Sequence, residues 1–441
     1  MSNAVSSATA MAASPDIARR TMRKVELRLV PFCMLLFVVS FVDRINVSFA
    51  ALKMNKALAI GNEAFATGVG LFFIGYFLFE VPSNLILHRV GARRWISRIV
   101  IGWGALTALH ALVVGTGSFY SLRFLLGLAE AGFAPGLLFY FTQWFPQQYR
   151  GAIMSRYLTA SAIAIIVGAP MSTSLFHLDG LFGIADWQWM FLVEGALGVG
   201  LGLITLFYLP DRPETAGWLS DEERRWLTGA IETQRRATAG LQGFAPALRD
   251  ARVWVLTFMF FTFGISSYGV IFWIPQIIKQ IPGISTDAVG WTTSAIWICA
   301  IIAMTLVGRN SDRTNERYLH FAASMVIGAL GLIGSVLVGD PVVALVLIGI
   351  GAVGIWCGLG VFWTIPQQLF SGAAAAGCIA LINATGNLGG YVGPKLMAFS
   401  KDSFGSFATG LVALGVIMIA GAAAALVMKA ATRGTTANAG L

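Results

Sequence analysis

Charged residues are scarce in this chain. Only 12% of its 441 residues are Asp, Glu, Lys or Arg, whereas soluble domains carry about 25%. Hydrophobic residues make up 57% of the sequence, and the mean hydropathy is +0.75. This composition excludes an ordinary soluble domain and predicts a chain embedded in a lipid bilayer.

Cysteine and histidine are also rare, with four of each. The cysteines, which are Cys33, Cys299, Cys357 and Cys378, lie in apolar runs without the spacing of a metal or redox site. The histidines lack metal-ligand neighbours, and no Ser/His/Asp set or phosphate-binding loop is present. The sequence therefore predicts no metal, no cofactor and no enzyme.

Long apolar runs dominate what remains. A helix needs about 20 apolar residues to cross a bilayer, and twelve runs reach that length. They span residues 28–52, 65–88, 95–115, 118–142, 152–176, 188–209, 253–279, 286–308, 319–339, 341–366, 373–398 and 404–428. The predicted fold class is an all-α membrane protein with twelve transmembrane helices.

The basic residues predict how the chain is oriented. The net charge is +9, but the Lys and Arg residues fall in short loops, which argues against nucleic-acid binding. Most of the 30 lie on the side of the two chain ends, and the opposite side holds Lys53, Lys56, Lys279, Lys395 and Lys401. We expect cytoplasmic termini in a multi-pass inner-membrane protein. The first 24 residues are polar, so no cleaved signal peptide is expected.

A charged segment divides the chain near its middle. Within it, Ser220 precedes Glu223 by three residues, which is typical of a capping box and predicts a short amphipathic helix. The expected organisation is a tail (residues 1–27), a six-helix bundle (28–209), a linker (210–252), a second six-helix bundle (253–428) and a tail (429–441).

The two halves look like repeats. Arg89 and Arg313 follow the second and eighth spans, and they are 224 positions apart. Pro170 and Pro394, each preceded closely by glycine, are separated by the same offset. Two independent pairs at one offset indicate a parallel duplication around a central cavity, which is typical of transporters.

Four charged residues lie deep in apolar runs of the first half. At 1.5 Å per residue, Asp43, Arg44 and Arg123 all lie about 22 Å from the membrane edge on the side of the chain ends. Glu130 is two helical turns beyond Arg123 on nearly the same face. A charge at this depth costs at least about 2.5–3.5 kcal/mol, so we expect a functional site in a shared cavity.

The chemistry of these side chains suggests an ion-coupled binding site. Arginine offers a planar fork of donors that suits a carboxylate, so Arg44 and Arg123 are the predicted substrate ligands. Buried acids can carry protons, so Asp43 and Glu130 are the predicted coupling groups. We expect Asp43 to pair with Arg123 when the site is empty. The offset mates of Asp43 and Arg44 are uncharged, which assigns the ionic work to the first half.

Long motifs carry a family resemblance. They are Asp-Arg-Ile-Asn-Val at 43–47, Gly-Tyr-Phe-Leu-Phe-Glu-Val-Pro-Ser-Asn at 75–84, Arg-Phe-Leu-Leu-Gly-Leu-Ala-Glu-Ala-Gly-Phe-Ala-Pro-Gly at 123–136 and Asn-Ala-Thr-Gly-Asn-Leu-Gly-Gly at 383–390. With them the chain resembles the major facilitator superfamily, and within it the anion:cation symporters of organic anions. Phe41 and His88 depart from the usual Tyr and Asp. The resemblance implies the same roles for the four charged residues, and substrate contact by Tyr76, Trp363 and Asn383.

Other charged residues are expected to control gating rather than binding. We expect Glu80 and Glu194 to form gating salt bridges with loop arginines. Arg89 is also expected to contribute to gating. Asp312 is expected to form a conformational latch with Arg313, Glu316 and Arg317.

The sequence therefore predicts a monomeric importer of a small organic anion coupled to protons. The carboxylate could be a sugar acid, a hydroxy-dicarboxylate or an aromatic acid. An anion exchanger, a Na⁺-coupled carrier and a non-transporting sensor with a transporter fold remain alternatives.

Overall fold

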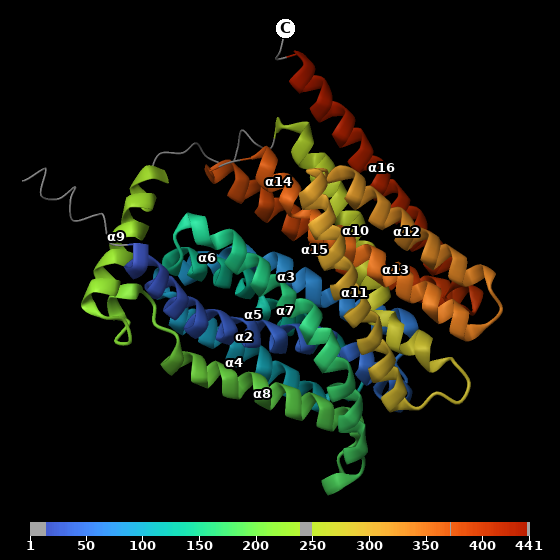
Figure 1. Ribbon diagram of the computed structural model, residues 1–441. Helices are drawn as coiled ribbons and strands as arrows, with labels where there is room; N and C mark the ends of the chain where they lie inside the picture. Colours follow the sequence, from blue (N-terminus) through green and yellow to red (C-terminus); the bar gives the residue numbers. More distant parts are fainter. Residues whose placement is uncertain (1–14, 239–248, 371, 439–441) are drawn as a thin grey trace, which may run out of the picture.

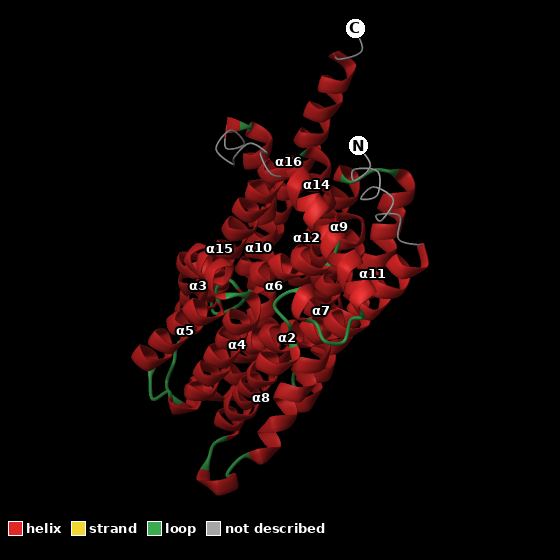
Figure 2. Cartoon of the chain, turned by 90° about the vertical axis from the view of Figure 1, so that its left-hand side faces the viewer, coloured by secondary structure: helices red, strands yellow, loops and turns green. Residues whose placement is uncertain are grey.

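The computed structural model describes residues 15–238, 249–370 and 372–438, which are almost entirely helical (Figure 1, Figure 2). The first half contains α2 (Pro15–Ala57), α3 (Asn62–Val90), α4 (Ala92–Leu109), α5 (Thr116–Glu130), α6 (Phe133–Trp144), α7 (Gln147–Ser174) and α8 (Asp186–Tyr208). The second half contains α10 (Ala251–Lys279), α11 (Thr286–Thr314), α12 (Tyr318–Leu337), α13 (Pro341–Phe362), α14 (Thr364–Leu369), α15 (Gly372–Phe404) and α16 (Ala408–Asn438). Helix α9 (Asp221–Thr238) lies between the two halves in the sequence. The structure also contains four short 3-10 helices, which are η1 (His110–Leu112), η2 (Leu175–Leu178), η3 (Leu181–Gly183) and η4 (Pro213–Thr215).

The predicted fold class is confirmed. Within the described residues, eleven helical segments are long and apolar enough to cross a membrane. The remaining predicted span, residues 373–398, lies in α15, which is 33 residues long and carries Asn383, Thr385 and Asn387 in its interior. These amides and this hydroxyl make α15 less apolar than its neighbours.

The internal repeat is visible in the helix boundaries. When the offset of 224 is added to Asn62 and Val90, the ends of α3, the result is Thr286 and Thr314, the ends of α11. The same offset relates α4 to α12, α7 to α15 and α8 to α16 within a few residues, and it relates the end of α2 to the end of α10. The two halves are thus structural copies, which lie side by side in Figure 1.

Three helix pairs join the halves, and they follow the repeat. Helix α3 packs on α15, α7 packs on α11, and α2 packs on α10. The first two pairs are related by the offset, and the third pairs a helix with its own copy. An axis of approximate two-fold symmetry therefore passes between α2 and α10, the helices that carry residues 43–46 and their mates.

Polar side chains hold the halves together at the end of the molecule opposite the chain termini. These inter-half pairs are Asn62 with Asp402 (2.7 Å), Glu63 with Lys395 (2.8 Å) and His177 with Asp287 (2.9 Å). The first described residues of α2 and the last of α16 lie away from this end, at the left and at the top of Figure 1. The structure is therefore clasped at the end away from the termini.

One predicted span is interrupted. Residues 118–142 were expected to form a single helix, but α5 ends at Glu130 and α6 begins at Phe133. Gly132 has a left-handed backbone (φ +84°), and Pro135 lies at the third position of α6, where its missing N–H costs no helical hydrogen bond. The break leaves Glu130 at the carboxyl end of α5. Similarly, α13 ends at Phe362 instead of continuing to residue 366.

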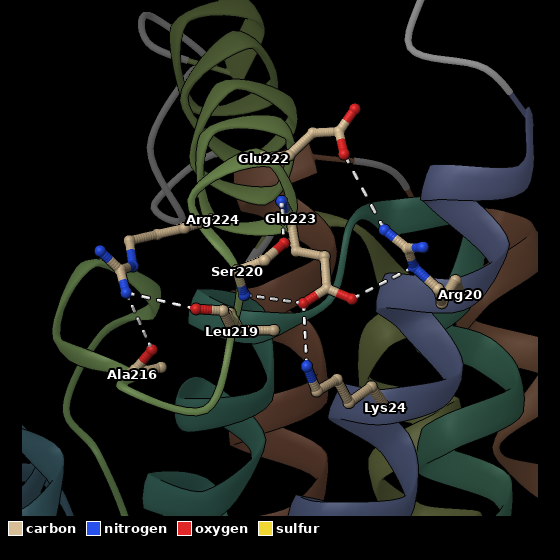
Figure 3. Close-up of polar contacts among 8 residues, drawn as sticks. All are labelled: Arg20, Lys24, Ala216, Leu219, Ser220, Glu222, Glu223 and Arg224. Carbon is tan, nitrogen blue, oxygen red and sulfur yellow. Dashed lines mark hydrogen bonds and ion pairs between the residues drawn. The ribbon is translucent and has the colours of Figure 1, made fainter.

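The linker helix α9 docks on the extended start of α2 (Figure 3). Ser220 and Glu223 form the predicted capping box, with reciprocal bonds of 2.9 and 3.2 Å. Lys24 donates to Glu223 at 3.0 Å, and Arg20 lies 3.4 Å from the same carboxylate. Because α2 begins at Pro15, residues expected in a tail are helical and form this contact.

Candidate functional site

An ion pair lies at the middle of the first half. Arg44 Nη2 of α2 donates to Glu130 Oε1 at the end of α5, and Ser40 Oγ donates to the same oxygen at 3.0 Å. Glu130 is fully buried. The carboxyl end of a helix repels an anion, so the guanidinium of Arg44 offsets both that repulsion and the burial of the carboxylate.

Aromatic rings surround Arg44, which is partly buried, and Arg123, which is fully buried. The guanidinium carbon of Arg44 lies 5.3 Å from the centroids of Phe72 and Tyr76 and 5.8 Å from that of Phe41. Arg123 lies 5.0 Å from the centroid of Phe72, so both cations contact this one ring. Arg123 is 0% exposed, and its Nε and Nη2 atoms have no hydrogen-bond partner. The two predicted ligands are thus brought together with Glu130.

Asp43 points elsewhere. Its carboxylate faces Trp103 and Thr107 of α4, although neither side chain forms a hydrogen bond of good geometry with it. A Cβ added at Gly198 of α8 would lie 3.5 Å from Asp43 Oδ2. The expected pairing of Asp43 with Arg123 is therefore wrong for this structure. Successive residues of a helix are about 100° apart, so Asp43 and Arg44 share a depth but face different helices.

The residues implied by the family resemblance occupy different places. Tyr76 lies against Arg44. Asn383 of α15 lies beside Glu80 of α3, at the meeting of the two halves. Trp363 packs on Phe260, with ring centroids 4.7 Å apart, at the junction of α13 and α14. Tyr76 thus contacts the arginine pair directly. Asn383 is connected to the pair indirectly, because it contacts Glu80, which is close to Arg44.

The expected gating contacts differ from those in the structure. Glu80 lies near Arg44 and Asn383 instead of a loop arginine. Asp312 pairs with Arg317 at 2.6 Å, within the turn that follows α11. The side chains of Arg89 and Arg313 are exposed at the equivalent ends of α3 and α11. The loop-arginine partner proposed for Glu80 is therefore wrong, and the latch at Asp312 and Arg313 stays a prediction.

Tyr268 of α10 is a site residue that the sequence reading missed. Its hydroxyl donates to Asn387 Oδ1 at 3.3 Å and faces Arg44 across the interface between the halves. Its ring lies 4.5 Å from that of Phe73. The signal was present, because Tyr268 is the offset mate of Arg44. The absence of a charge at this position does not exclude a role, because a phenol is a strong polar group.

Glu194 of α8 was also misplaced. It was expected to pair with loop arginines, but it is 1% exposed and accepts from Asn46 Nδ2 at 2.8 Å and Ser172 Oγ at 2.7 Å. Sequence could have found it, because Asn46 lies one turn after Asp43 on the same face of α2. Glu194 therefore belongs to the buried polar region around residues 43–46.

Comparisons with known proteins agree with this arrangement. A family model described as Major Facilitator Superfamily matches residues 32–394. A protein of Agrobacterium vitis, whose name assigns it to tartrate transport, is 45% identical over 94% of this chain and 96% of its own. A quinolone resistance transporter of Acinetobacter baumannii is 40% identical over 92% of this chain and 94% of its own.

A solved structure shares the fold. It is a bacterial homolog of the human lysosomal transporter Spinster in an inward-facing, unoccupied conformation, with a TM-score of 0.77 and 16% identity over 94% of this chain and 97% of that one. The family match covers most of the residues that form the helices described above. The chain therefore belongs to the Major Facilitator Superfamily and is a membrane transporter of its organic-anion type.

Proposed function

We propose that this transporter imports a small organic carboxylate together with protons by alternating access. We favour a hydroxy-dicarboxylate as the substrate class, because the names of two relatives from Agrobacterium vitis assign them to tartrate transport. The protein functions as a monomer in the inner membrane, with both termini in the cytoplasm. The positive-inside bias of the loops supports this orientation.

The observation that carries the proposal is the pair of guanidinium groups on Phe72. Glu130 is bonded to Arg44, while two nitrogen atoms of Arg123 lack partners. A buried cation without hydrogen bonds is costly, and a substrate carboxylate bound to the fork of Arg123 offsets that cost. A second carboxylate of the same substrate is then within the reach of Arg44, at the edge of the same ring.

Coupling follows from competition for Arg44. When a substrate carboxylate binds Arg44, Glu130 loses its cation while it stays buried at the end of α5. A carboxylate in that position takes up a proton, because burial penalises its charged form. Protonation of Glu130 in turn frees Arg44 for the substrate. Glu130 is thus the principal coupling group, and Tyr76, Asn383 and Trp363 supply uncharged substrate contacts.

Closure of the site involves the second half. Tyr268 and Asn387 lie on α10 and α15, which pack on α2 and α3. When the halves rock about this interface, the contact between Tyr268 and Arg44 changes, and access passes from one side of the membrane to the other. Arg89, at the end of α3, and Asp312 and Arg313, at the end of α11, stabilise one of the two states.

Substitution of Glu130 tests the mechanism. We expect Glu130→Gln in proteoliposomes to abolish accumulation of L-tartrate driven by a proton gradient, and to preserve exchange of labelled for unlabelled L-tartrate. Accumulation equal to that of the wild type would contradict the role of Glu130. Accumulation that follows a Na⁺ gradient, exchange without net uptake, or binding without uptake would instead support the Na⁺-coupled carrier, the exchanger or the sensor.

A further inference from the structure

A second group of acids lies behind the arginine site, and among the described residues these acids form no ion pair with a cation. Asp43 and Asn46 are one turn apart on α2 and face α4 and α8, whereas Arg44 faces α3 and α5. Asp43 and Glu194 are each 1% exposed. The charged groups that face Asp43 are Glu194 of α8 and Glu130 of α5, and both are acids.

The hydrogen bonds of the two acids differ. Glu194 accepts from Ser172 on one oxygen and from Asn46 on the other. Two donors stabilise an ionised carboxylate. Neither oxygen of Asp43 has a partner of good geometry, and the nearby Trp103 nitrogen and Thr107 hydroxyl also lack partners. A buried carboxyl group in such surroundings is stable only when it is neutral.

We propose that Asp43 and Glu194 share a single proton, which resides on Asp43 in this conformation, and that Glu194 is a proton-binding residue of the transport cycle. Two like charges in one buried region do not both ionise. This inference rests on the proposed proton coupling and adds Glu194 to the groups that carry it.

A path connects this acid pair to the rocking of the halves. Pro170 has no N–H, so the carbonyl of Ile166 lacks its helical partner and accepts instead from Ser294 Oγ of α11 at 2.5 Å. Thr173 packs so closely on Gly290 of α11 that an added Cβ would lie 2.3 Å from its hydroxyl. Ser172, between these contacts, donates to Glu194.

The movement of α11 therefore changes the donors of Glu194. When the contact of α7 with α11 is lost, Ser172 is free to move away from the carboxylate. Glu194 then holds a proton more tightly, since it has lost a stabilising donor. The pair thus responds to the conformation of the transporter, and its proton moves with the change of access.

Infrared spectroscopy of the purified full-length protein tests the proposal without a substrate. The C=O stretching band of a protonated, buried carboxyl group is followed as a function of pH. Asp43→Asn is expected to remove this band. Glu194→Gln is expected to shift its titration midpoint at least about 1 pH unit lower, a tenfold loss of proton affinity, because the neighbouring negative charge is gone.

Glu194→Gln preserves the local structure, since the glutamine oxygen still accepts from Asn46 and the Ser172 hydroxyl can accept from the amide. The matched control is Asp186→Asn, at the start of the same helix, where the buried acid lies 3.3 Å from Lys53. We expect that variant to leave the midpoint unchanged. A band that survives Asp43→Asn, or a midpoint unmoved by Glu194→Gln, would overturn the shared proton.

Transport measurements separate this inference from the proposed function. Proton influx per L-tartrate is measured with a pH-sensitive dye inside the proteoliposomes. We expect Glu194→Gln to lower this ratio at least about threefold, with the exchange rate retained. A wild-type ratio in Glu194→Gln but not in Glu130→Gln would overturn the role of Glu194 alone. Wild-type ratios in both variants, together with the infrared shift, would refute the coupling mechanism but leave the shared proton.

Discussion

At the scale of single residues, Arg123 sets the chemistry of the site. It is a fully buried cation that contacts the face of Phe72. A charge at this depth costs at least about 2.5–3.5 kcal/mol, and a cation–π contact returns up to about 2 kcal/mol when it is desolvated. The part of the burial cost that the contact with Phe72 does not offset explains why an anionic ligand is favourable beside Arg123. Glu130 contributes to the balance, but it is bonded to Arg44.

Arg123→Lys is expected to raise the KM for L-tartrate at least about tenfold. Lysine preserves the charge but loses the fork, and a charge-assisted hydrogen bond is worth about 1.5–3 kcal/mol. Arg44→Lys is expected to behave similarly in the same uptake assay. Arg98→Lys is the control, because Arg98 stacks on Trp95 away from the site. Wild-type KM values in both site variants would contradict the carboxylate clamp.

The sequence predicted correctly that Arg44, Arg123 and Glu130 lie close together, because the helical rise relates positions along neighbouring helices. Their depth in the membrane stays a prediction. Prediction from the sequence failed for the directions of Asp43 and Glu194. The rotation of a helix about its axis depends on the neighbours that pack against it, and a single sequence does not reveal those neighbours. The same limit hid the approach of Tyr268 to Arg44.

At the scale of elements, glycines and prolines decide where helices break and touch. The turn between α5 and α6 depends on Gly132, whose φ is +84° and whose added Cβ would lie 2.3 Å from Ser83 Oγ. Gly75 allows α3 to approach α5, since its added Cβ would lie 2.4 Å from the carbonyl oxygen of Phe124. These positions hold the end of α5, and therefore Glu130, in place.

Gly132→Ala is expected to destabilise the protein by at least about 1–2 kcal/mol, the cost of a left-handed backbone for a residue with a Cβ. The midpoint of thermal unfolding in detergent measures the loss. Gly102→Ala is the matched control, because its added Cβ would lie 3.8 Å from Ala129, an ordinary contact. Equal midpoints for the two variants would show that the turn does not require glycine.

The docking of α9 on α2 depends on the charge of Glu223. Partial burial acts to raise the pKa of this carboxyl, but hydrogen bonds from Ser220 and Lys24 and the charges of Lys24 and Arg20 hold the pKa below its usual value. Because its pKa is lowered, ionised Glu223 stabilises the docked helix at pH values above the pKa of glutamate in the unfolded chain, about 4.3. The stabilisation is lost as the pH falls below that value. Figure 3 shows the contacts concerned.

Glu223→Gln is therefore expected to increase amide hydrogen exchange in α9 two- to fivefold at pH 7. Glutamine preserves the capping bond but loses the ion pairs, which are worth about 0.5–1 kcal/mol with partly exposed partners. Asp221→Asn, which affects the exposed ion pair with Arg224, serves as the control. Exchange in α9 that is faster in the control than in Glu223→Gln would contradict this account.

At the scale of the whole molecule, the repeat and the inter-half pairs determine which state is stable. The pairs lie at one end, while α2 and α10 pack at the symmetry axis. Exposed ion pairs are worth about 0–1 kcal/mol each, so the clasp is weak enough to open during a transport cycle.

Combined neutralisation of Glu63, Asp287 and Asp402 to the corresponding amides is expected to shift the population toward a state that is open at this end. Lys56 and Gln280 are exposed and occupy equivalent positions of the repeat in the two halves. Pulsed electron–electron double resonance between spin labels at these two positions should show a longer distance. The control is Asp340→Asn, whose carboxylate caps α13 within the second half. An unchanged distance distribution in the triple variant would exclude these pairs as a clasp.

The sequence by itself determined the membrane class, the helical fold and the duplication of this protein. Those properties depend on hydropathy, on repeat spacing and on the fixed rise of a helix, which are all local. Only the tertiary structure decided that Arg44 pairs with Glu130, that Asp43 faces Trp103 and Thr107 of α4, and that Tyr268 faces Arg44. These contacts depend on the rotation and packing of helices, which the side chains of distant segments decide together.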